Sequence, residues 1–349
     1  MNNNSEHPQK PQVRFRRFRR TLLLLGLLFV VGTPLLIEFR FRRPIGEGPA
    51  GPPVPAEPFQ TVWTTRQLQV VGLGDSITRG LGANSRSHTF FQRLLDNPDD
   101  EYADMRGKCL SVVLPNHDAI NLAVSGSTSI DHERVIREEL PSYDEEVFGL
   151  VVMTSGGNDL IHPYGRRPPS EAAMYGATLA QAEPWIKNFE ERLLGNLREI
   201  QDKFAGGCMI FLADIYDPTD GVGDAPSIFL PPWPDGLAIH ARYNETIRRV
   251  AGTMEHVHIV PLYEHFLGHG SHCRQFWRST YDRDDPTYWF FTNIEDPNDR
   301  GYDAIRRVFL NEIVKQRTGI GVTRLSSGMR VSRWWTRLAL VVKRGSVER

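Results

Sequence analysis

The sequence predicts an α/β protein, a three-layer α/β/α sandwich around a central parallel five-stranded sheet. Short apolar runs that stop at small or polar turn residues alternate along the chain with longer segments whose apolar residues recur at helical spacing. This alternation favours a parallel sheet with helices on both faces. With 349 residues, 40% of them hydrophobic, the chain can bury one sizeable core, so we expect a single domain of about 250 residues with tails.

The five predicted strands end in turns of small residues. Residues 67–73 form the first strand and stop at Gly-Asp-Ser, residues 118–127 run into Ser-Gly-Ser, and residues 148–159 run into Gly-Gly-Asn-Asp. Residues 208–213 and 257–262 are the fourth and fifth strands. Ligands of an open parallel sheet bind outside the carboxyl ends of its strands, so we expect the first three turns to meet at one edge.

The predicted helices lie between these strands. They cover residues 87–95, 131–140, 181–204, 238–254 and 298–318. The longest, residues 181–204, carries aromatic and aliphatic residues at helical spacing, and we expect this apolar stripe to belong to the core.

An apolar stretch near the N-terminus predicts a membrane anchor. Residues 21–37 contain no charge, and their number lies between that of a spanning helix and that of a signal-peptide core. No small-residue cleavage site follows, so we expect the stretch to stay uncleaved. Five arginines precede it and three follow it, which favours a cytoplasmic N-terminus and an exported domain, periplasmic or extracellular.

The anchor divides the chain into five predicted parts. They are a cytoplasmic basic tail (1–20), a transmembrane anchor (21–38), a Pro/Gly linker that holds the domain off the membrane (39–64), a globular domain (65–320) and a basic amphipathic C-terminal tail (321–349). Tryptophans among basic residues suit a helix on an anionic membrane surface, and the same composition also fits a disordered tail.

The charge distribution argues against a nucleic-acid partner. Lysine and arginine outnumber aspartate and glutamate by nine to two in residues 1–45 and by seven to one in residues 321–349. The residues between carry 25 basic against 39 acidic side chains. An acidic domain between basic ends is unlike a nucleic-acid-binding surface and fits ends that face a membrane.

No metal or other cofactor is predicted. His265, His269 and His272 have a spacing that would place them on one helix face, where they could bind zinc, but Gly268 and Gly270 disfavour a helix there. The three cysteines are too few for a disulfide framework, although one bridge is compatible with their number. Three aspartates after the fourth strand lack the full calcium-loop pattern: Asp214, Asp217 and Asp220.

Ser76 is the candidate nucleophile. It lies on the tight turn after the first strand, where a hydroxyl can be held exposed at the end of a rigid element. Attack by such a hydroxyl creates an oxyanion, which nearby N–H groups must stabilise. Gly-Asp-Ser alone is more typical of an ordinary polar turn, so the other two turns carry the argument.

The turns resemble the sequence blocks of the SGNH or GDSL hydrolase family over residues 65–320. Gly74-Asp75-Ser76 matches the first block, Gly126 the second, and Gly156-Gly157-Asn158-Asp159 the third. The resemblance implies a flavodoxin-like fold with Ser76 as the nucleophile. It also implies an oxyanion hole formed by the Ser76 and Gly126 backbone N–H groups and the Asn158 side chain. The implied activity is removal of an acyl group, above all acetyl, from a small-molecule, glycan or lipid ester.

The fourth block departs from the family pattern of Asp-x-x-His-Pro-Asn. Here Asp296 stands where the family has the basic histidine, and Asn293 stands where it has the orienting aspartate. A carboxylate with an ordinary pKa of about 3.9 is a weak base for a serine hydroxyl. We therefore expect a histidine from the loop 263–288 to act instead, His272 before His269.

Other residues could complete such a site. The candidates that could orient the imidazole are Asp282, Asp284, Asp285 and Asp296. His162, just after Gly-Gly-Asn-Asp, and His88, near the nucleophile turn, are weaker candidates for the base. The altered fourth block also leaves open a non-catalytic binding protein, and an acyltransferase would need the same groups.

Overall fold

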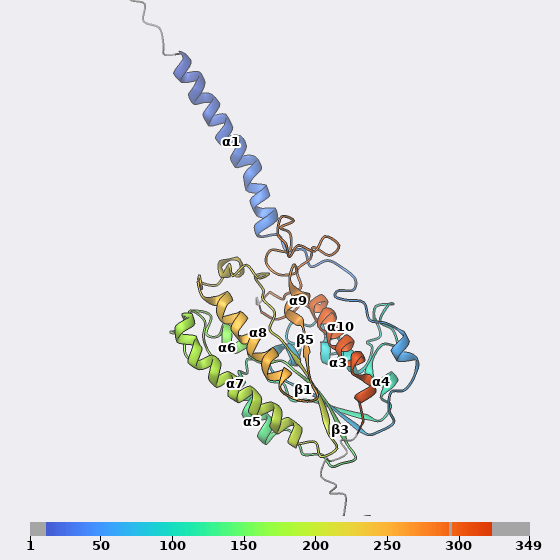
Figure 1. Ribbon diagram of the computed structural model, residues 1–349. Helices are drawn as coiled ribbons and strands as arrows, with labels where there is room; N and C mark the ends of the chain where they lie inside the picture. Colours follow the sequence, from blue (N-terminus) through green and yellow to red (C-terminus); the bar gives the residue numbers. More distant parts are fainter. Residues whose placement is uncertain (1–11, 293–294, 323–349) are drawn as a thin grey trace, which may run out of the picture.

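The computed structural model describes residues 12–292 and 295–322 of the chain (Figure 1). In this part, five strands form one parallel sheet in the order β2-β1-β3-β4-β5, which confirms the predicted fold class. The strands are β1 (Leu68–Leu73), β2 (His117–Asn121), β3 (Phe148–Met153), β4 (Cys208–Ala213) and β5 (Val257–Val260).

Helices connect the strands, as the apolar spacing predicted. The described α-helices are α1 (Gln12–Arg40), α2 (Ser76–Arg79), α3 (Phe90–Leu95), α4 (Leu110–Val113), α5 (Ser129–Glu138), α6 (Gly157–Ile161), α7 (Leu179–Asp202), α8 (Gly236–Gly252), α9 (Leu262–Phe266) and α10 (Asp299–Lys315). Short 3-10 helices cover Glu57–Gln60, Arg86–His88, Ala225–Ile228 and Arg317–Gly319.

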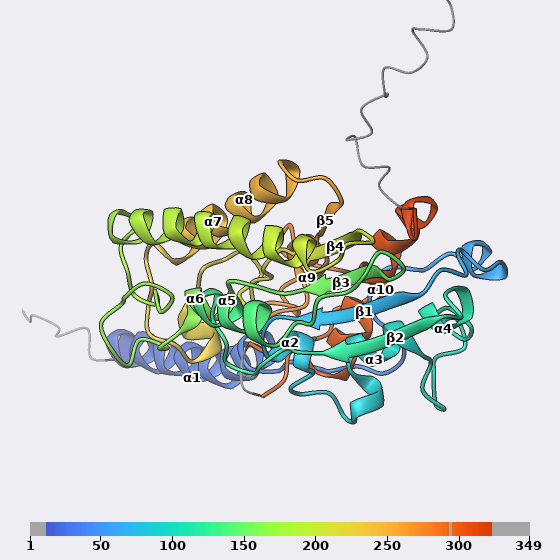
Figure 2. The same cartoon turned by 90° about the horizontal axis from the view of Figure 1, so that it is seen from below.

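The sheet separates two apolar cores because successive strand residues point to opposite faces. Val71 and Leu73 of β1 join the core under α5, α7 and α8, whereas Leu68 and Val70 join the core under α3, α4 and α10. Figure 2 shows these helices on the two sides of the sheet. The apolar stripe predicted on residues 181–204 packs in the first of these cores, with Phe189, among other residues of α7, fully buried.

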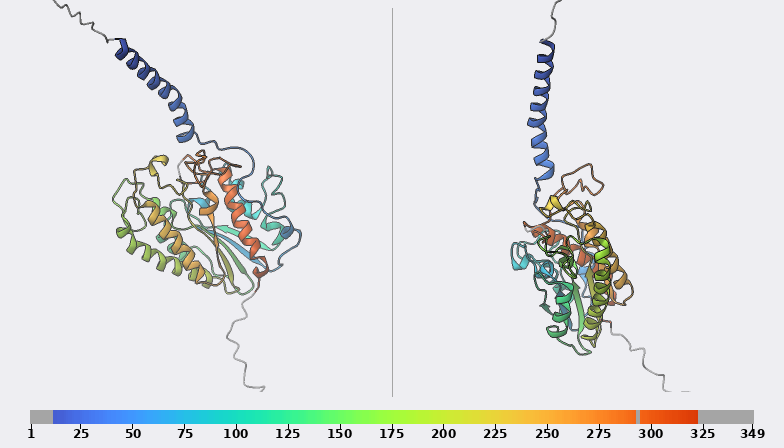
Figure 3. Two further views of the ribbon diagram at one scale, coloured as in Figure 1. Left: turned by 45° about the horizontal axis from the view of Figure 1, so that its top comes forward. Right: turned by 90° about the vertical axis from the view of Figure 1, so that its left-hand side faces the viewer.

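Helix α1 projects from the domain, as both views in Figure 3 show. Residues Phe18–Arg40 are long and apolar enough to cross a membrane, and their large apolar side chains are exposed. This property is shared by membrane anchors and signal sequences. The helix leaves the domain at the carboxyl edge of the sheet (Figure 1).

The segment predicted as a spacer packs on the domain instead. Ala50, Val54 and Phe59 are buried in the core next to α10. The Ala50 N–H donates to Asp303 Oδ2 at 3.0 Å, and Asn311 Nδ2 donates to the Pro53 carbonyl at 3.1 Å. The Pro/Gly composition predicted a free linker. The few apolar residues of this segment instead pack against the apolar surface next to α10. Residues 1–11 and most of the predicted C-terminal tail, from residue 323, lie outside the described residues.

Candidate active site

Ser76 is the first residue of α2, directly after β1. Gly74 has a φ of +123°, and a Cβ at this position would collide with Thr154, so the turn requires glycine. Asp75 caps α2 by accepting the Ile77 N–H on its Oδ1 at 3.1 Å. These two residues turn the chain so that Ser76 lines a pocket at the carboxyl edge of the sheet.

Asp75 is a buried carboxyl group next to the nucleophile. Thr154 Oγ1 donates to Asp75 Oδ1 at 2.9 Å, and the Thr154 hydroxyl also contacts Thr78 Oγ1 at 2.9 Å. Burial raises the pKa of Asp75 to about 6, and the negative charge of Asp296 acts in the same direction. The carboxyl group of Asp75 therefore titrates much closer to neutral pH than an exposed aspartate.

Hydrogen bonds join the three turns that the sequence placed at one edge. Ser127 Oγ donates to the Gly74 carbonyl at 3.0 Å, which ties the turn after β2 to the turn after β1. Asn158 Nδ2 donates to the Ser127 carbonyl at 2.8 Å, which ties in the turn after β3. A primary amide carries two N–H bonds, and this contact uses one of them. The structure thus brings Ser76 and Asn158 into the same pocket.

Gly126 precedes Ser127 on the turn after β2. It is exposed and has a φ of +80°. The residues that line the pocket do not include Gly126, although the carbonyl of the next residue is held by Asn158. The role of its N–H group in the oxyanion hole remains a prediction.

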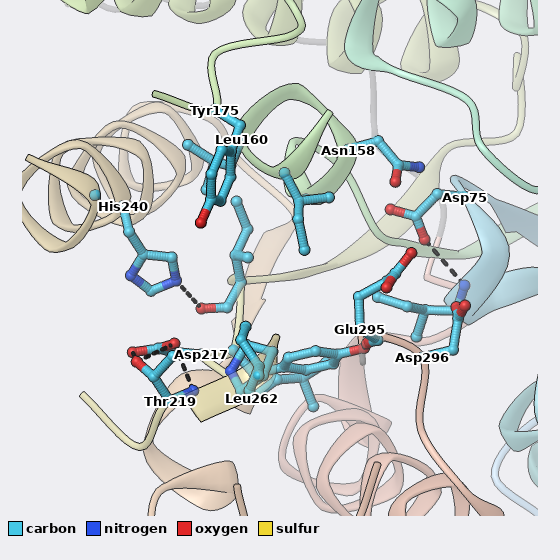
Figure 4. A pocket seen from close by; sticks show the side chains of 18 of the residues that line it. Asp75, Asn158, Leu160, Tyr175, Asp217, Thr219, His240, Leu262, Glu295 and Asp296 are labelled. Carbon is cyan, nitrogen blue, oxygen red and sulfur yellow. Dashed lines mark hydrogen bonds between the residues drawn. The ribbon is translucent and has the colours of Figure 1, made fainter. Parts of the chain in front are cut away.

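The pocket has a volume of about 140 Å³ and a mostly apolar lining (Figure 4). Asp75, Asn158 and Asp296 lie on one side of it, and His240, Asp217 and Thr219 lie on the other. His240 Nε2 donates to the Ile215 carbonyl at 2.9 Å. A small, apolar space with a few converging polar groups is typical of a site for a small ligand or acyl group.

Glu295 and Asp296 come into this pocket from the segment before α10. The Tyr164 hydroxyl donates to Glu295 Oε1 at 2.5 Å, and burial raises the pKa of Glu295. Asp296 is only 1% exposed, and its carbonyl accepts the Phe291 N–H at 2.7 Å. Asn298 then caps α10 by accepting the Gly301 N–H. The Asp-Pro-Asn sequence therefore holds a carboxylate at a fixed place in the pocket.

The two histidines that the sequence favoured lie elsewhere. His272 accepts a hydrogen bond from Gln275 Nε2 on its Nδ1 at 2.7 Å, and its Nε2 lies 3.8 Å from Asp224 Oδ2. His269 stacks on Trp289, with ring centroids 3.5 Å apart, and donates from Nδ1 to the Thr287 carbonyl. Neither side chain lines the Ser76 pocket.

Burial also weakens both histidines as bases. It lowers the pKa of His269, and it lowers the pKa of His272 to about 4, with the Arg278 charge contributing. The weaker candidates do not line the pocket either: His88 contacts Asp100 at 2.9 Å and Asp299 at 3.3 Å, and the His162 ring is tilted against the Tyr164 ring, with centroids 5.3 Å apart.

Among the candidate orienting aspartates, only Asp296 lines the Ser76 pocket. Asp282 lies 3.7 Å from His269, and Asp285 pairs with Arg300 at 2.5 Å. Asp284 lines a separate surface hollow that also includes His265. The signal for Asp296 was present in the sequence, because it occupies the position of the family's histidine.

The aspartates after β4 serve the loop that carries them. Asp217 accepts hydrogen bonds from Thr219 and Gly221, and Asp220 accepts the Gly268 and Gly270 N–H groups. Within residues 12–292 and 295–322, no group of three His, Cys, Asp or Glu side chains is arranged to hold a metal ion.

Comparison with known families agrees with the observed fold. The model of the GDSL-like lipase/acylhydrolase family matches residues 73–304, well over half of the chain. The chain belongs to this family of ester-hydrolysing enzymes. A search of curated proteins found no match.

Several solved structures are similar to the chain. A lipase/acylhydrolase from Enterococcus faecalis is 16% identical, with 72% of this chain and 97% of that chain covered and a TM-score of 0.43. A catalytic mutant of an acetylxylan esterase from Geobacillus stearothermophilus is 15% identical, with 72% and 96% covered and a TM-score of 0.43. A lipase from a goat rumen metagenome is 17% identical, with 69% and 95% covered and a TM-score of 0.43.

Proposed function

We propose that this protein removes an acyl group, above all acetyl, from a lipid or carbohydrate ester at a membrane surface, with Ser76 as the nucleophile. The observation that carries the proposal is the hydrogen-bonded chain from Gly74 through Ser127 to Asn158, which gathers three turns beside Ser76. Family membership supports ester hydrolysis, whereas the acyl group and its carrier are proposals.

In the proposed reaction, Ser76 Oγ attacks the ester carbonyl carbon and transfers its proton to a base. The oxyanion accepts hydrogen bonds from the second Asn158 N–H and from the backbone N–H groups of Ser76 and Gly126. The bond between the carbonyl carbon and the alcohol oxygen then breaks, and the base returns the proton to the departing alcohol. Water hydrolyses the acyl-enzyme by the same steps, which releases the carboxylic acid and restores Ser76.

Asp296 is the base that the side-chain arrangement favours. It is buried, lines the same pocket as Ser76 and occupies the family's histidine position in the sequence. Its charge acts on Asp75, so two carboxyl groups share one poorly solvated site. The place of this carboxylate in the pocket, beside Asp75 and on the same lining as Ser76, is what supports the assignment.

The proposed location follows from α1. A helix of this length and apolarity, with more arginines before it than after it, would anchor the chain with the domain on the exported side. The substrate would then be met outside the cytoplasm, beside the membrane.

The proposal is tested with Ser76→Ala in the full chain. We expect hydrolysis of 4-nitrophenyl acetate to fall at least about 1,000-fold, because no other hydroxyl replaces the nucleophile. A fluorophosphonate probe should label the wild type and not the variant. Ser142→Ala, at an exposed serine before β3, is the matched control and should behave as the wild type.

Two results would contradict the proposal. Hydrolysis that survives Ser76→Ala with unchanged thermal stability would exclude Ser76 as the nucleophile. A wild-type protein that neither reacts with the probe nor cleaves esters would instead be a binding protein with the same cleft.

A further inference from the structure

One loop forms a wall of the active-site pocket. Residues 223–230 follow β4, and Ala225, Ile228 and Leu230 of this 223–230 loop point into the pocket that contains Ser76. Most of the exposed lining surface is apolar, and further apolar side chains contribute to it: Leu160, Ile161, Ile215, Trp233, Leu237 and Leu262. Such a lining favours a hydrocarbon chain over a sugar, since sugar hydroxyls need polar partners when they are buried.

The same loop also holds the end of α1. Arg40 Nη1 pairs with Asp224 Oδ2 at 2.6 Å, and the Arg43 guanidinium donates to the Ser227 carbonyl. Arg43 also lies over the Phe229 ring, 5.6 Å from its centroid. The 223–230 loop therefore both forms a wall of the pocket and binds the carboxyl end of the predicted anchor. We call the surface that binds this end of α1 the seat.

A second segment completes this seat. The Phe39 ring contacts Trp277 and Phe276, with centroids 5.2 Å and 5.9 Å apart. Arg274 Nη2 pairs with Glu38 Oε1 at 2.6 Å. These contacts fix the carboxyl end of α1 against the domain, next to the pocket, rather than on a free tether.

The length of α1 places the membrane surface at this seat. The 23 residues Phe18–Arg40 span about 34 Å as a helix, close to the roughly 30 Å of a bilayer's hydrocarbon core. Since Arg40 ends the helix and binds Asp224, the headgroup layer begins within about one helical turn of the 223–230 loop.

Large apolar side chains are exposed around the seat. Phe229 is 72% exposed, Phe276 63% and Trp277 57%, and Phe41 and Ile45 are similarly uncovered. Phe229 has a φ of +63°, a left-handed conformation that non-glycine residues rarely adopt and that turns its ring outward. Exposed aromatic residues near the end of a spanning helix suit the membrane interface.

We propose that the 223–230 loop, together with Phe41, Ile45, Phe276 and Trp277, lies in the headgroup layer of the bilayer that α1 crosses, so that the pocket receives an acyl ester of a membrane lipid directly from that bilayer. This inference rests on the proposed ester hydrolysis and narrows its substrate from lipid or carbohydrate to lipid. In this arrangement the membrane covers the exposed aromatic side chains. The apolar wall of the pocket then adjoins the headgroup layer, so a lipid can enter the pocket without crossing water.

The position of the loop is tested with a fluorescent probe on Phe229→Cys in the full chain, reconstituted into phosphatidylcholine nanodiscs. The three native cysteines are buried, so labelling should concentrate on the new thiol. The matched control is Val112→Cys on α4, at the opposite edge of the sheet and 44% exposed. We expect lipids with a quencher near the headgroup to quench the probe at 229 at least fivefold more than the probe at 112. Equal quenching would overturn the proposal.

The substrate is tested by comparing two acetyl esters. One is an ether lipid with a single acetyl ester in ether-linked phosphatidylcholine nanodiscs, where no other ester is present, and the other is soluble 4-nitrophenyl acetate. Phe229→Ser should lower the ratio of the lipid rate to the soluble rate at least fivefold, whereas Val112→Ser should leave it unchanged. An unchanged ratio for Phe229→Ser would overturn the proposal.

The two experiments separate this inference from the proposed function. If Ser76→Ala retained acetate release from both esters, the proposed chemistry would be wrong, whereas the quenching at 229 requires no activity and would still locate the loop. If Ser76→Ala were inactive but the probe at 229 were not quenched, the chemistry would stand and the membrane-facing pocket would be rejected.

Discussion

One side of the pocket, with Ser76 and Asn158, is built from the short turns after β1 and β3. The side with Asp296, the proposed base, comes from the long connection of residues 261–298 between β5 and α10. Each turn directly follows a strand, so the sheet alone fixes where Ser76 and Asn158 lie. The long connection folds over itself through contacts such as His269 on Trp289, and only its last part reaches the pocket. Sequence motifs therefore locate residues on short turns much better than residues on long connections.

The largest effect should come from replacing Asp296. Asp296→Asn removes the proposed base with little change in volume, and we expect kcat/KM for 4-nitrophenyl acetate to fall about 100- to 1,000-fold. Glu295→Gln, at the neighbouring pocket residue, is the matched control and should cost less than tenfold. Asp296→His would restore the family's imidazole, and we expect partial recovery with a pH profile that rises near the ordinary histidine pKa of about 6.5. If the Asp296→Asn variant kept wild-type rates, Asp296 would not be the base.

Asn158 tests the short-turn side. Asn158→Ala should lower kcat about 100-fold with little change in KM, because an oxyanion donor acts mainly in the transition state. The variant also loses the bond to the Ser127 carbonyl, so thermal stability must be measured beside the rates. A change in KM alone would mean that Asn158 binds the substrate without stabilising the oxyanion.

Replacing Asp75 should have a smaller effect, on the pH dependence of the free energy of unfolding. Its folded-state pKa of about 6 lies above the ordinary value of 3.8, so the folded state favours the protonated form. The stability it contributes is present below about pH 4 and is lost as the pH rises through about 6, by about 3 kcal/mol. Asp75→Asn should reduce the loss of unfolding free energy between pH 4 and pH 7 by about that amount, as measured by denaturant unfolding. An identical pH dependence in both proteins would contradict the assigned pKa.

The smallest effect on catalysis is expected from the two histidines of the long connection. His272→Gln and His269→Gln should keep kcat/KM within about threefold of the wild type, since neither side chain lines the pocket. Both should lower the melting temperature, because His272 binds Gln275 and His269 stacks on Trp289. A loss of 100-fold or more in a folded variant would instead make that histidine the base, as the sequence suggested.

Most of the fold could be predicted from the sequence. The apolar runs before Gly74 and Gly156 gave β1 and β3 almost to the residue, and the periodicity of α7 placed its buried face correctly. Strand and helix periods are local properties, which the order of residues records directly. The predicted parallel sheet likewise implied that the turns after β1, β2 and β3 would meet at one edge.

The rest depended on contacts between distant segments. The choice of His272 assumed that only an imidazole could activate a serine, and an ordinary aspartate pKa supported this choice. Burial changes that premise, because desolvation moves carboxyl and imidazole pKa values in opposite directions: upward for Asp75 and downward for His272. The packing of Ala50 and Val54 on α10 could not be predicted either. A Pro/Gly-rich composition indicates a flexible segment, but it does not show whether another part of the fold offers an apolar surface for packing.

The hydrogen bond from the Ala50 N–H to Asp303 has a consequence for biosynthesis. Its two residues are 253 positions apart, and the segment around Ala50 emerges from the ribosome soon after α1. At about 5–20 residues per second, its partner helix is completed on the order of ten to fifty seconds later. The contact between Ala50 and Asp303 thus forms late in synthesis, and a product truncated before α10 would lack the partner of this segment.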